Sequence, residues 1–247
     1  MNRKLAIPLI CLAALLLSMA CTLTIPGGLG LRGSGNVITE SRQVSDFNQV
    51  VLSGIGELQI TQGESESLEI EAEDNLLPLI ETEVRNNTLY IGIKENRTGI
   101  SPTKPIRYQL SLKELDSLEI SGAGSAKVDV LETETLDLML SGVGAIKVGT
   151  LTADTLAVAI SGAGNCQVAG QVQRLKVDMS GAGSLEAGDL QAQTADVQIS
   201  GVGGAKLWVS ETLDAVLSGV GNLEYYGNPS VTMEESGVGR MKSLGDK

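Results

Sequence analysis

Residues 136–148 read LDLMLSGVGAIKV, residues 156–168 read LAVAISGAGNCQV and residues 175–187 read LKVDMSGAGSLEA. The three segments share the tetrapeptide Ser-Gly-x-Gly between two runs in which apolar and polar residues alternate. The tetrapeptide occurs eight times, starting at Ser53, Ser121, Ser141, Ser161, Ser180, Ser200, Ser218 and Ser236. From Ser121 onward successive copies are 18–20 residues apart, which indicates a repeat architecture.

The alternation predicts what kind of repeat this is. Apolar residues recur at every second position, for example at Leu156, Val158 and Ile160 before a tetrapeptide and at Cys166 and Val168 after it. A period of two is typical of strands with one buried face. A coil of this length cannot bury that face alone, but it can when it stacks on its neighbours at ~4.8 Å spacing. The sequence therefore predicts an all-β fold, a parallel β-solenoid of about 18–20-residue coils with glycine corners.

Composition restricts the chemistry that the chain can perform. The 247 residues include no histidine, which removes the commonest general base, the commonest zinc ligand and any Ser-His or Cys-His pair. One Trp and one Phe are present, so the core must be mainly aliphatic, as in a narrow repetitive interior. The net charge of −12 disfavours nucleic acid and anionic lipid as partners. We expect a protein that is not an enzyme and has no cofactor and no metal site.

The first 20 residues have the pattern of an export signal. Arg3 and Lys4 precede an apolar stretch that ends at Ala20 and is short for a membrane span. Residues 1–20 are therefore predicted to be a signal peptide. Its removal would eliminate two positive charges and take the net charge from −12 to −14.

The sequence LSMAC, which ends at Cys21, is similar to the lipobox of bacterial lipoproteins. This similarity implies cleavage before Cys21, a lipid on its thiol and attachment to a membrane on the extracytoplasmic side. The pair Ser18-Met19 departs from the favoured lipobox residues, so an ordinary secretory signal is the alternative. Residues 21–34, rich in glycine, would then form a lipidated tether.

The remaining chain divides where the period begins. Residues 35–115 alternate without a fixed repeat and are predicted to form irregular β coils or an antiparallel excursion, with a hairpin at Asn86-Asn87. Residues 116–247 are predicted to form the regular solenoid. Its last coil carries Glu235 where the other copies have an aliphatic residue or Met, which is typical of a terminal cap.

The sequence also resembles a known family. The residues that carry the resemblance are the run Arg42-x-Val44-x-x-Phe47-x-x-Val50, the eight Ser-Gly-x-Gly copies and the run Tyr225-Tyr226-Gly227-x-Pro229-x-Val231. Together they resemble the DUF2807 family, also described as the auto-transporter adhesin head GIN domain, over roughly residues 38–243. The resemblance implies a right-handed β-helix on a secreted or lipid-anchored protein. The name of the family suggests adhesion, but the resemblance implies no particular ligand and no catalytic residues.

Trp208 and Tyr226 are the candidate ligand-contact residues. Each stands eight positions after the serine of its tetrapeptide, so both are predicted to lie in one outward column on consecutive coils. Two stacked aromatic faces could bind a sugar ring or a partner protein, or they could simply stiffen the sheet.

Other residues have simpler interpretations. Glu69, Glu71 and Glu73 are predicted to share an outward face beside Asp74, where they form either a calcium site or, as we favour, a solvated acidic face. Cys166 is predicted to point inward as an inert thiol.

Three functional hypotheses follow from the sequence. The first is a non-enzymatic lipoprotein of the cell envelope, at the outer membrane or cell surface, whose solenoid surface binds an unknown protein or glycan. The second is a polysaccharide-active β-helix enzyme. The third is a periplasmic structural or stress-sensing lipoprotein with a protein partner.

Overall fold

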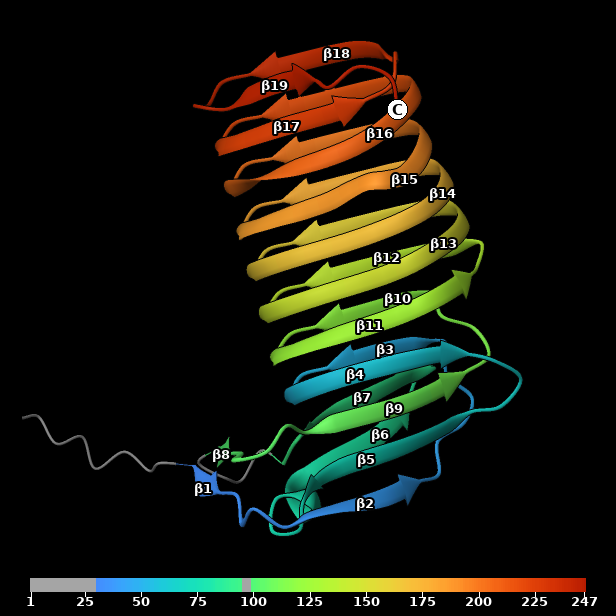
Figure 1. Ribbon diagram of the computed structural model, residues 1–247, viewed down its shortest axis with the longest axis vertical. Helices are drawn as coiled ribbons and strands as arrows, with labels where there is room; N and C mark the ends of the chain where they lie inside the picture. The colour runs from blue at the N-terminus through green and yellow to red at the C-terminus, as the bar shows by residue number, and fades with distance from the viewer. Residues whose placement is uncertain (1–29, 95–98) are drawn as a thin grey trace, which may run out of the picture.

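The structure is a computed structural model that describes residues 30–94 and 99–247 (Figure 1). The predicted signal peptide and the predicted lipidation site at Cys21 lie outside these residues. In the part of the chain that is described, no helix has the length and apolar character needed to cross a membrane. The elements are β1 (Leu31–Arg32), β2 (Val37–Arg42), β3 (Gln49–Leu52), β4 (Ile55–Gln62), β5 (Ser67–Glu73), the 3₁₀ helix η1 (Leu77–Leu79), β6 (Ile80–Arg85), β7 (Thr88–Ile93), β8 (Ile100–Ser101), β9 (Arg107–Leu112), β10 (Ser117–Ile120), β11 (Ala123–Glu132), β12 (Thr135–Leu140), β13 (Val143–Ile160), β14 (Ala163–Met179), β15 (Ala182–Ile199), β16 (Val202–Leu217), β17 (Val220–Tyr226), β18 (Ser230–Glu235) and β19 (Arg240–Ser243).

The C-terminal part of the chain is the predicted parallel solenoid. Strands β10 to β17 pair in parallel with the coil before and the coil after, β18 and β19 pair with the coil before, and Figure 1 shows the coils stacked along the long axis. Val158 pairs with Leu138 on one side and with Val177 on the other, and each of the three is at most 3% exposed. The predicted all-β solenoid of about 20-residue coils is therefore confirmed.

Each coil turns three times. In β13 the buried residues are Ile146 and Val148, then Leu151 and Ala153, then Leu156, Val158 and Ile160. Within each group every second residue is buried. Between groups the spacing is three positions, from Val148 to Leu151 and from Ala153 to Leu156, so the chain turns at 149–150 and at 154–155, where two successive residues are not buried. Together with the Ser-Gly-x-Gly corner, these two turns divide the coil into three sides. In β13 the first side is residues 143–148, the second side is residues 151–153 and the third side is residues 156–160.

The glycine corners are closely packed backbone. A Cβ placed on Gly162 would lie 2.0 Å from the carbonyl oxygen of Gly142 in the preceding coil. The same overlap recurs at Gly142 against Gly122 and at Gly201 against Gly181. A side chain cannot be accommodated there without separating two coils, because real Cβ atoms do not approach a carbonyl so closely.

The N-terminal part adds antiparallel pairs to the end of the solenoid. Strands β3 and β4 continue the parallel ladder below β10 and β11, while β2 pairs antiparallel with β5, β5 with β9, and β6 with β7. Asn86 and Asn87 have φ values of 49° and 61°, as a two-residue hairpin turn requires, which confirms the hairpin between β6 and β7. The region therefore contains an antiparallel excursion, one of the two expectations, together with parallel pairs of β3 with β7 and of β4 with β9.

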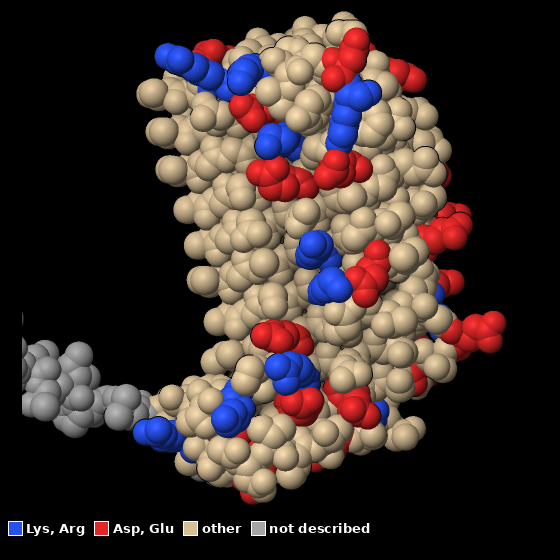
Figure 2. Space-filling view, in the orientation of Figure 1, with Lys and Arg blue, Asp and Glu red and all other residues tan. Residues whose placement is uncertain are grey.

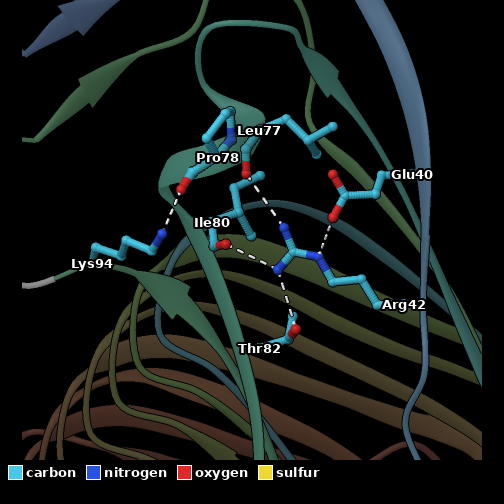
Figure 3. A network of polar contacts seen from close by, with 7 residues as sticks. All are labelled: Glu40, Arg42, Leu77, Pro78, Ile80, Thr82 and Lys94. Atoms are coloured by element: carbon cyan, nitrogen blue, oxygen red, sulfur yellow. Dashed lines mark hydrogen bonds and ion pairs between the residues drawn. The ribbon is translucent and has the colours of Figure 1, made fainter.

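Arg42 ties this N-terminal part together (Figure 3). Its guanidinium donates to the carbonyl oxygens of Ile80 (2.9 Å) and Leu77 (3.3 Å) and to Oγ1 of Thr82 (3.1 Å), and it pairs with Glu40 at 2.8 Å. A planar guanidinium has enough donors to satisfy all of these acceptors at once. Arg42, one of the residues behind the family resemblance, therefore holds η1 and β6 against β2 and has a structural role.

Glu73 holds a second set of segments at the end of β5. Its carboxylate accepts hydrogen bonds from the backbone N–H of Gly35 (2.7 Å) and of Thr103 (2.8 Å), and from the Thr103 hydroxyl. Strand β1 also pairs with β8, so the last residues of the predicted tether are joined to the folded domain. The expectation that Glu73 lies on a solvated face is wrong: it is 1% exposed, because the segment around Thr103 covers it.

The buried Glu73 carboxylate predicts acid sensitivity. Burial by itself raises the pKa of Glu73, but the hydrogen bonds from Thr103, Gly35 and Lys104 outweigh it and leave that pKa below its ordinary value. A carboxyl with a lowered folded-state pKa stabilises the fold above its unfolded-state pKa, and the contribution is lost as the pH falls through the folded-state pKa. Glu73→Gln should therefore lower the urea midpoint at pH 7, and the deficit relative to wild type should shrink below about pH 4.

Circular dichroism of urea unfolding between pH 3 and pH 7 measures this difference. Glu69→Gln removes an exposed carboxylate from the same strand and is the matched control. A deficit for Glu73→Gln that stays constant over the whole pH range would contradict the assigned role.

Candidate functional site

The second side of the coils carries two parallel rows of outward side chains. Between the rows lies one inward residue per coil, such as Ala153, Val172 or Ala192, so the residues before and after it both point to solvent. The strand register aligns the first row from coil to coil, and this row consists of Glu132, Thr152, Gln171 and Gln191. The second row follows the inward residue of each coil and consists of Glu134, Asp154, Gln173, Gln193 and Glu211. Within it Gln173 donates a hydrogen bond to Asp154 of the preceding coil (2.7 Å), and Glu211 lies at an irregularity of the ladder between β15 and β16.

The two rows enclose a groove along the solenoid. It has a volume of about 1130 Å³ and runs from Gln62 in β4 to Ser210 and Glu211 in β16. Five coil steps at ~4.8 Å each give it a length of roughly 24 Å. Its floor is formed by Ala153 and Val172, and it follows the long axis shown in Figure 1.

Hydrogen bonds order the N-terminal end of the groove. The side-chain amide of Gln62 donates to the carbonyl oxygen of Glu132 (2.9 Å) and accepts from the N–H of Glu132 (2.9 Å). It therefore bonds to this residue's backbone in the way that a neighbouring strand would. Asp116 accepts from Nδ2 of Asn48 (2.6 Å) and from the Thr133 hydroxyl (3.3 Å). These side chains are therefore positioned before any ligand arrives.

The groove is strongly acidic. Its lining includes one ammonium group, from Lys113, and six carboxylates, from Glu114, Asp116, Glu132, Glu134, Asp154 and Glu211. Figure 2 shows acidic side chains along the right-hand edge, whereas the left-hand edge of the middle coils, where the glycine corners lie, shows only uncharged side chains. Such a groove repels anions and favours neutral or positively charged ligands.

Trp208 and Tyr226 lie opposite each other on neighbouring coils, as the sequence predicts. Both are half-buried, and Nζ of Lys247 lies 5.3 Å from the centroid of the Trp208 ring and 5.4 Å from that of Tyr226. Lys247 is held there by the carboxylate of Asp189 and the carbonyl oxygen of Gly188. The aromatic pair therefore contributes to the C-terminal structure through cation–π contacts, and its role in ligand contact stays a prediction.

The remaining sequence candidates do not form a site. Cys166 is buried, and burial raises the pKa of its thiol to about 12, so the group stays protonated. Glu71 pairs with Arg107 at 2.9 Å, and Asp74 accepts from Ser34 and Asn36, so neither faces a shared cation. Over residues 30–94 and 99–247, no cluster of three or more acidic or cysteine side chains has the geometry to hold a metal ion.

A smaller groove of about 810 Å³ lies beside the β6–β7 hairpin. There the guanidinium of Arg85 lies 4.1 Å from the centroid of the Tyr90 ring. This groove is lined by the hairpin, by η1 and by Ser53, whereas the groove on the second side is built by successive coils. The latter is the candidate site.

Fold and groove together define a class of protein, the β-solenoids that present a long lateral surface built from in-register rows. Residues 46–229 match the family described as "Putative auto-transporter adhesin, head GIN domain" (DUF2807), and the chain belongs to this family. No curated protein matches the chain.

Solved structures of similar proteins support the same fold. A "putative adhesin" from Bacteroides fragilis is 29% identical, with a TM-score of 0.84, and the match covers 87% of this chain and 100% of that one. A "putative lipid binding protein" from Parabacteroides distasonis is 24% identical, with a TM-score of 0.73 over 87% and 99% of the two chains. A "putative adhesin" from Parabacteroides merdae is 22% identical, with a TM-score of 0.69 over 87% and 98%.

Proposed function

We propose that this chain is a non-catalytic adhesin of the bacterial cell envelope, attached to a membrane through Cys21, and that the groove on the second side of the coils is its contact surface. The observation that carries the proposal is that the two rows line one groove: each coil adds one or two polar side chains to a single continuous surface. A surface built in this way recognises an extended partner, since no single coil holds a complete small-molecule pocket.

Membership of an adhesin-type family, and the similarity to the B. fragilis protein, support a role in attachment. The lipobox-like sequence supports an envelope location, because diacylation gives stable anchoring where a single chain would be marginal. The groove of the folded domain would then lie on the extracytoplasmic side, available to ligands outside the membrane.

A polysaccharide-active enzyme is the second candidate, because the groove contains the carboxylates that glycoside hydrolysis uses. The two candidates differ in a simple measurement. An enzyme releases new reducing ends from a bound polysaccharide over time, and an adhesin leaves the polymer unchanged. A periplasmic structural protein would differ from both in being protected from protease added to intact cells.

Attachment of living cells tests the proposal. Bacteria that express the full chain should adhere to wells coated with extracellular matrix or mucus, and Gln171→Arg with Gln191→Arg should reduce adhesion to the level of cells without the chain. Two bulky cations would fill the groove and pair with its carboxylates, so a ligand could no longer enter. Gln167→Arg with Gln198→Arg places the same charges on the first and third sides and should leave adhesion intact.

Replacement of residues 1–21 by an ordinary secretory signal, which is cleaved but not lipidated, should release the protein into the medium and abolish adhesion without changing the fold. The proposal fails if cells that display the chain adhere no better than cells without it, or if the groove and control variants lose adhesion equally.

A further inference from the structure

The first row of the groove continues into the aromatic pair. Gln171 pairs with Gln191, Gln191 pairs with Trp208, and Trp208 pairs with Tyr226. We propose that this row, the second row and the two aromatic rings form one binding track for an extended polysaccharide without acidic groups. The proposal rests on the proposed function and specifies its ligand class.

The side chains of the track match the chemistry of sugars. Carboxamides and the Thr152 hydroxyl both donate and accept hydrogen bonds, and carboxylates accept them, so the rows can satisfy hydroxyl groups in either orientation. Gln171, Gln191 and Thr152 are exposed and repeat once per coil, at ~4.8 Å, so they present polar groups at regular intervals to a ligand that is itself a repeating chain. Trp208 and Tyr226 are half-buried and Nζ of Lys247 lies over both rings, so the parts of the rings that stay exposed are the apolar surface that a sugar ring can contact.

Charge narrows the class of polysaccharide. Six carboxylates and one ammonium line the groove, and five of the carboxylates lie between residues 114 and 154, so a uronic-acid or sulfated polymer would be repelled most strongly at that end. A neutral chain meets no such penalty, and an amino-sugar chain would be attracted. The track is therefore suited to neutral or amino-sugar polymers.

The backbone of the track argues against an extended peptide as the ligand. Peptides in extended conformation are typically bound by the unpaired N–H and C=O groups of a sheet edge. In the first row, Thr152, Gln171 and Gln191 each pair with a residue of the coil before and of the coil after, so this row offers mainly side chains to a ligand. A hydroxyl-rich ligand can use such a surface, whereas a peptide would leave its own backbone groups unsatisfied.

Calorimetric titration of the purified folded chain tests the ligand class with defined probes. These are cellohexaose, the hexamers of N-acetylglucosamine and of glucosamine, the matching disaccharides, and hexagalacturonate. At least one non-acidic hexamer should bind about tenfold more tightly than its disaccharide, because it spans several coils, and hexagalacturonate should not bind. Equal affinity for hexamer and disaccharide in every pair, or preference for hexagalacturonate, would overturn the proposal.

Variants locate the binding on the track. Gln171→Ala with Gln191→Ala should weaken hexamer binding about tenfold, and Trp208→Ala should do the same, while Trp208→Phe should restore most of the affinity because it keeps an aromatic face. Gln167→Ala with Gln198→Ala removes two carboxamides from the other sides and should have no effect. Circular dichroism of each variant shows that the solenoid is intact. Binding that is unchanged in the track variants would place the sugar elsewhere and overturn the proposal.

The adhesion assay separates this proposal from the broader one. Periodate treatment of the coated wells cleaves the vicinal diols of 1,4-linked glucose and the vicinal amino alcohols of glucosamine, and chitinase cleaves 1,4-linked N-acetylglucosamine, which periodate leaves intact. Periodate, or chitinase where the ligand is N-acetylated, should abolish adhesion, and trypsin treatment should not. Adhesion that survives both periodate and chitinase and is lost after trypsin would overturn the polysaccharide ligand while the adhesin function stands. Absence of adhesion to untreated wells would remove both proposals.

Discussion

Gly162→Ala is expected to lower the unfolding free energy of the solenoid by more than about 4 kcal/mol, an exceptionally large effect for a single substitution. The added Cβ would lie 2.0 Å from the carbonyl oxygen of Gly142 and 2.6 Å from that of Ser141. Both contacts are with backbone that is itself hydrogen-bonded: the N–H groups of Ser161 and Gly162 donate to Leu140, and that of Ala163 donates to Gly142. Relief of the overlap therefore requires that these bonds break.

Gly63→Ala is the matched control for this substitution. Gly63 has no atoms within 4 Å of an added Cβ and no left-handed backbone conformation, so alanine there should be neutral or stabilise by about 0.4–1 kcal/mol. Urea unfolding and limited proteolysis measure both variants, and proteolysis also shows whether the coils beyond Gly162 separate from those before it, since repeat proteins need not unfold in one step. Similar stabilities for Gly162→Ala and Gly63→Ala would show that the corners are not tightly packed.

Leu138→Ala is expected to destabilise the fold by about 2–5 kcal/mol. Leu138 is 1% exposed and lies in an inward column between Leu118 and Val158. Backbone ladders fix the distance between coils, so neighbouring side chains cannot close the cavity that the substitution leaves. Removal of three buried carbons therefore costs both hydrophobic transfer and the cavity.

The exposed neighbour Asp137 supplies the control for this column. Asp137→Ala should change the unfolding free energy by no more than about 0.5 kcal/mol, as is usual for surface substitutions. Leu138→Met keeps most of the volume and should cost less than about 1.5 kcal/mol. A Leu138→Ala variant as stable as the Asp137→Ala variant would mean that the interior is not close-packed.

Local patterns were enough to predict the solenoid and the pairing of Trp208 with Tyr226. Alternation of period two identifies the buried column that includes Leu138, and the glycine corners set the register, because both depend on residues close in sequence. The hairpin at Asn86-Asn87 was predictable for the same reason, since the turn residues themselves carry the signal.

The groove was not predictable from these patterns because it depends on where the coil turns for the second and third time. No glycine motif marks those turns, and coil length varies at both of them between β15 and β16. Gln191 is eleven positions after its corner serine and Trp208 is eight positions after its own, so counting places them apart. An irregularity between Ala187 and Gln191 brings them into register.

Glu73 could not be predicted to be buried, for a different reason. Its strand alternates as an exposed face should, and the segment that covers it begins about 30 residues later in the chain. Only the tertiary structure reveals that three backbone N–H groups converge on this carboxylate.

The register that aligns the rows also bears on how such a protein can evolve. Each coil contacts the coils directly before and after it, and tandem duplication of one coil would reproduce the same corners and the same inward column. The duplicated coil would extend the lateral surface by one further step of ~4.8 Å without a redesign of the interior. Copy number alone would then set the reach of the molecule, and single outward substitutions in a new coil could change specificity while the ancestral coils maintain the original one.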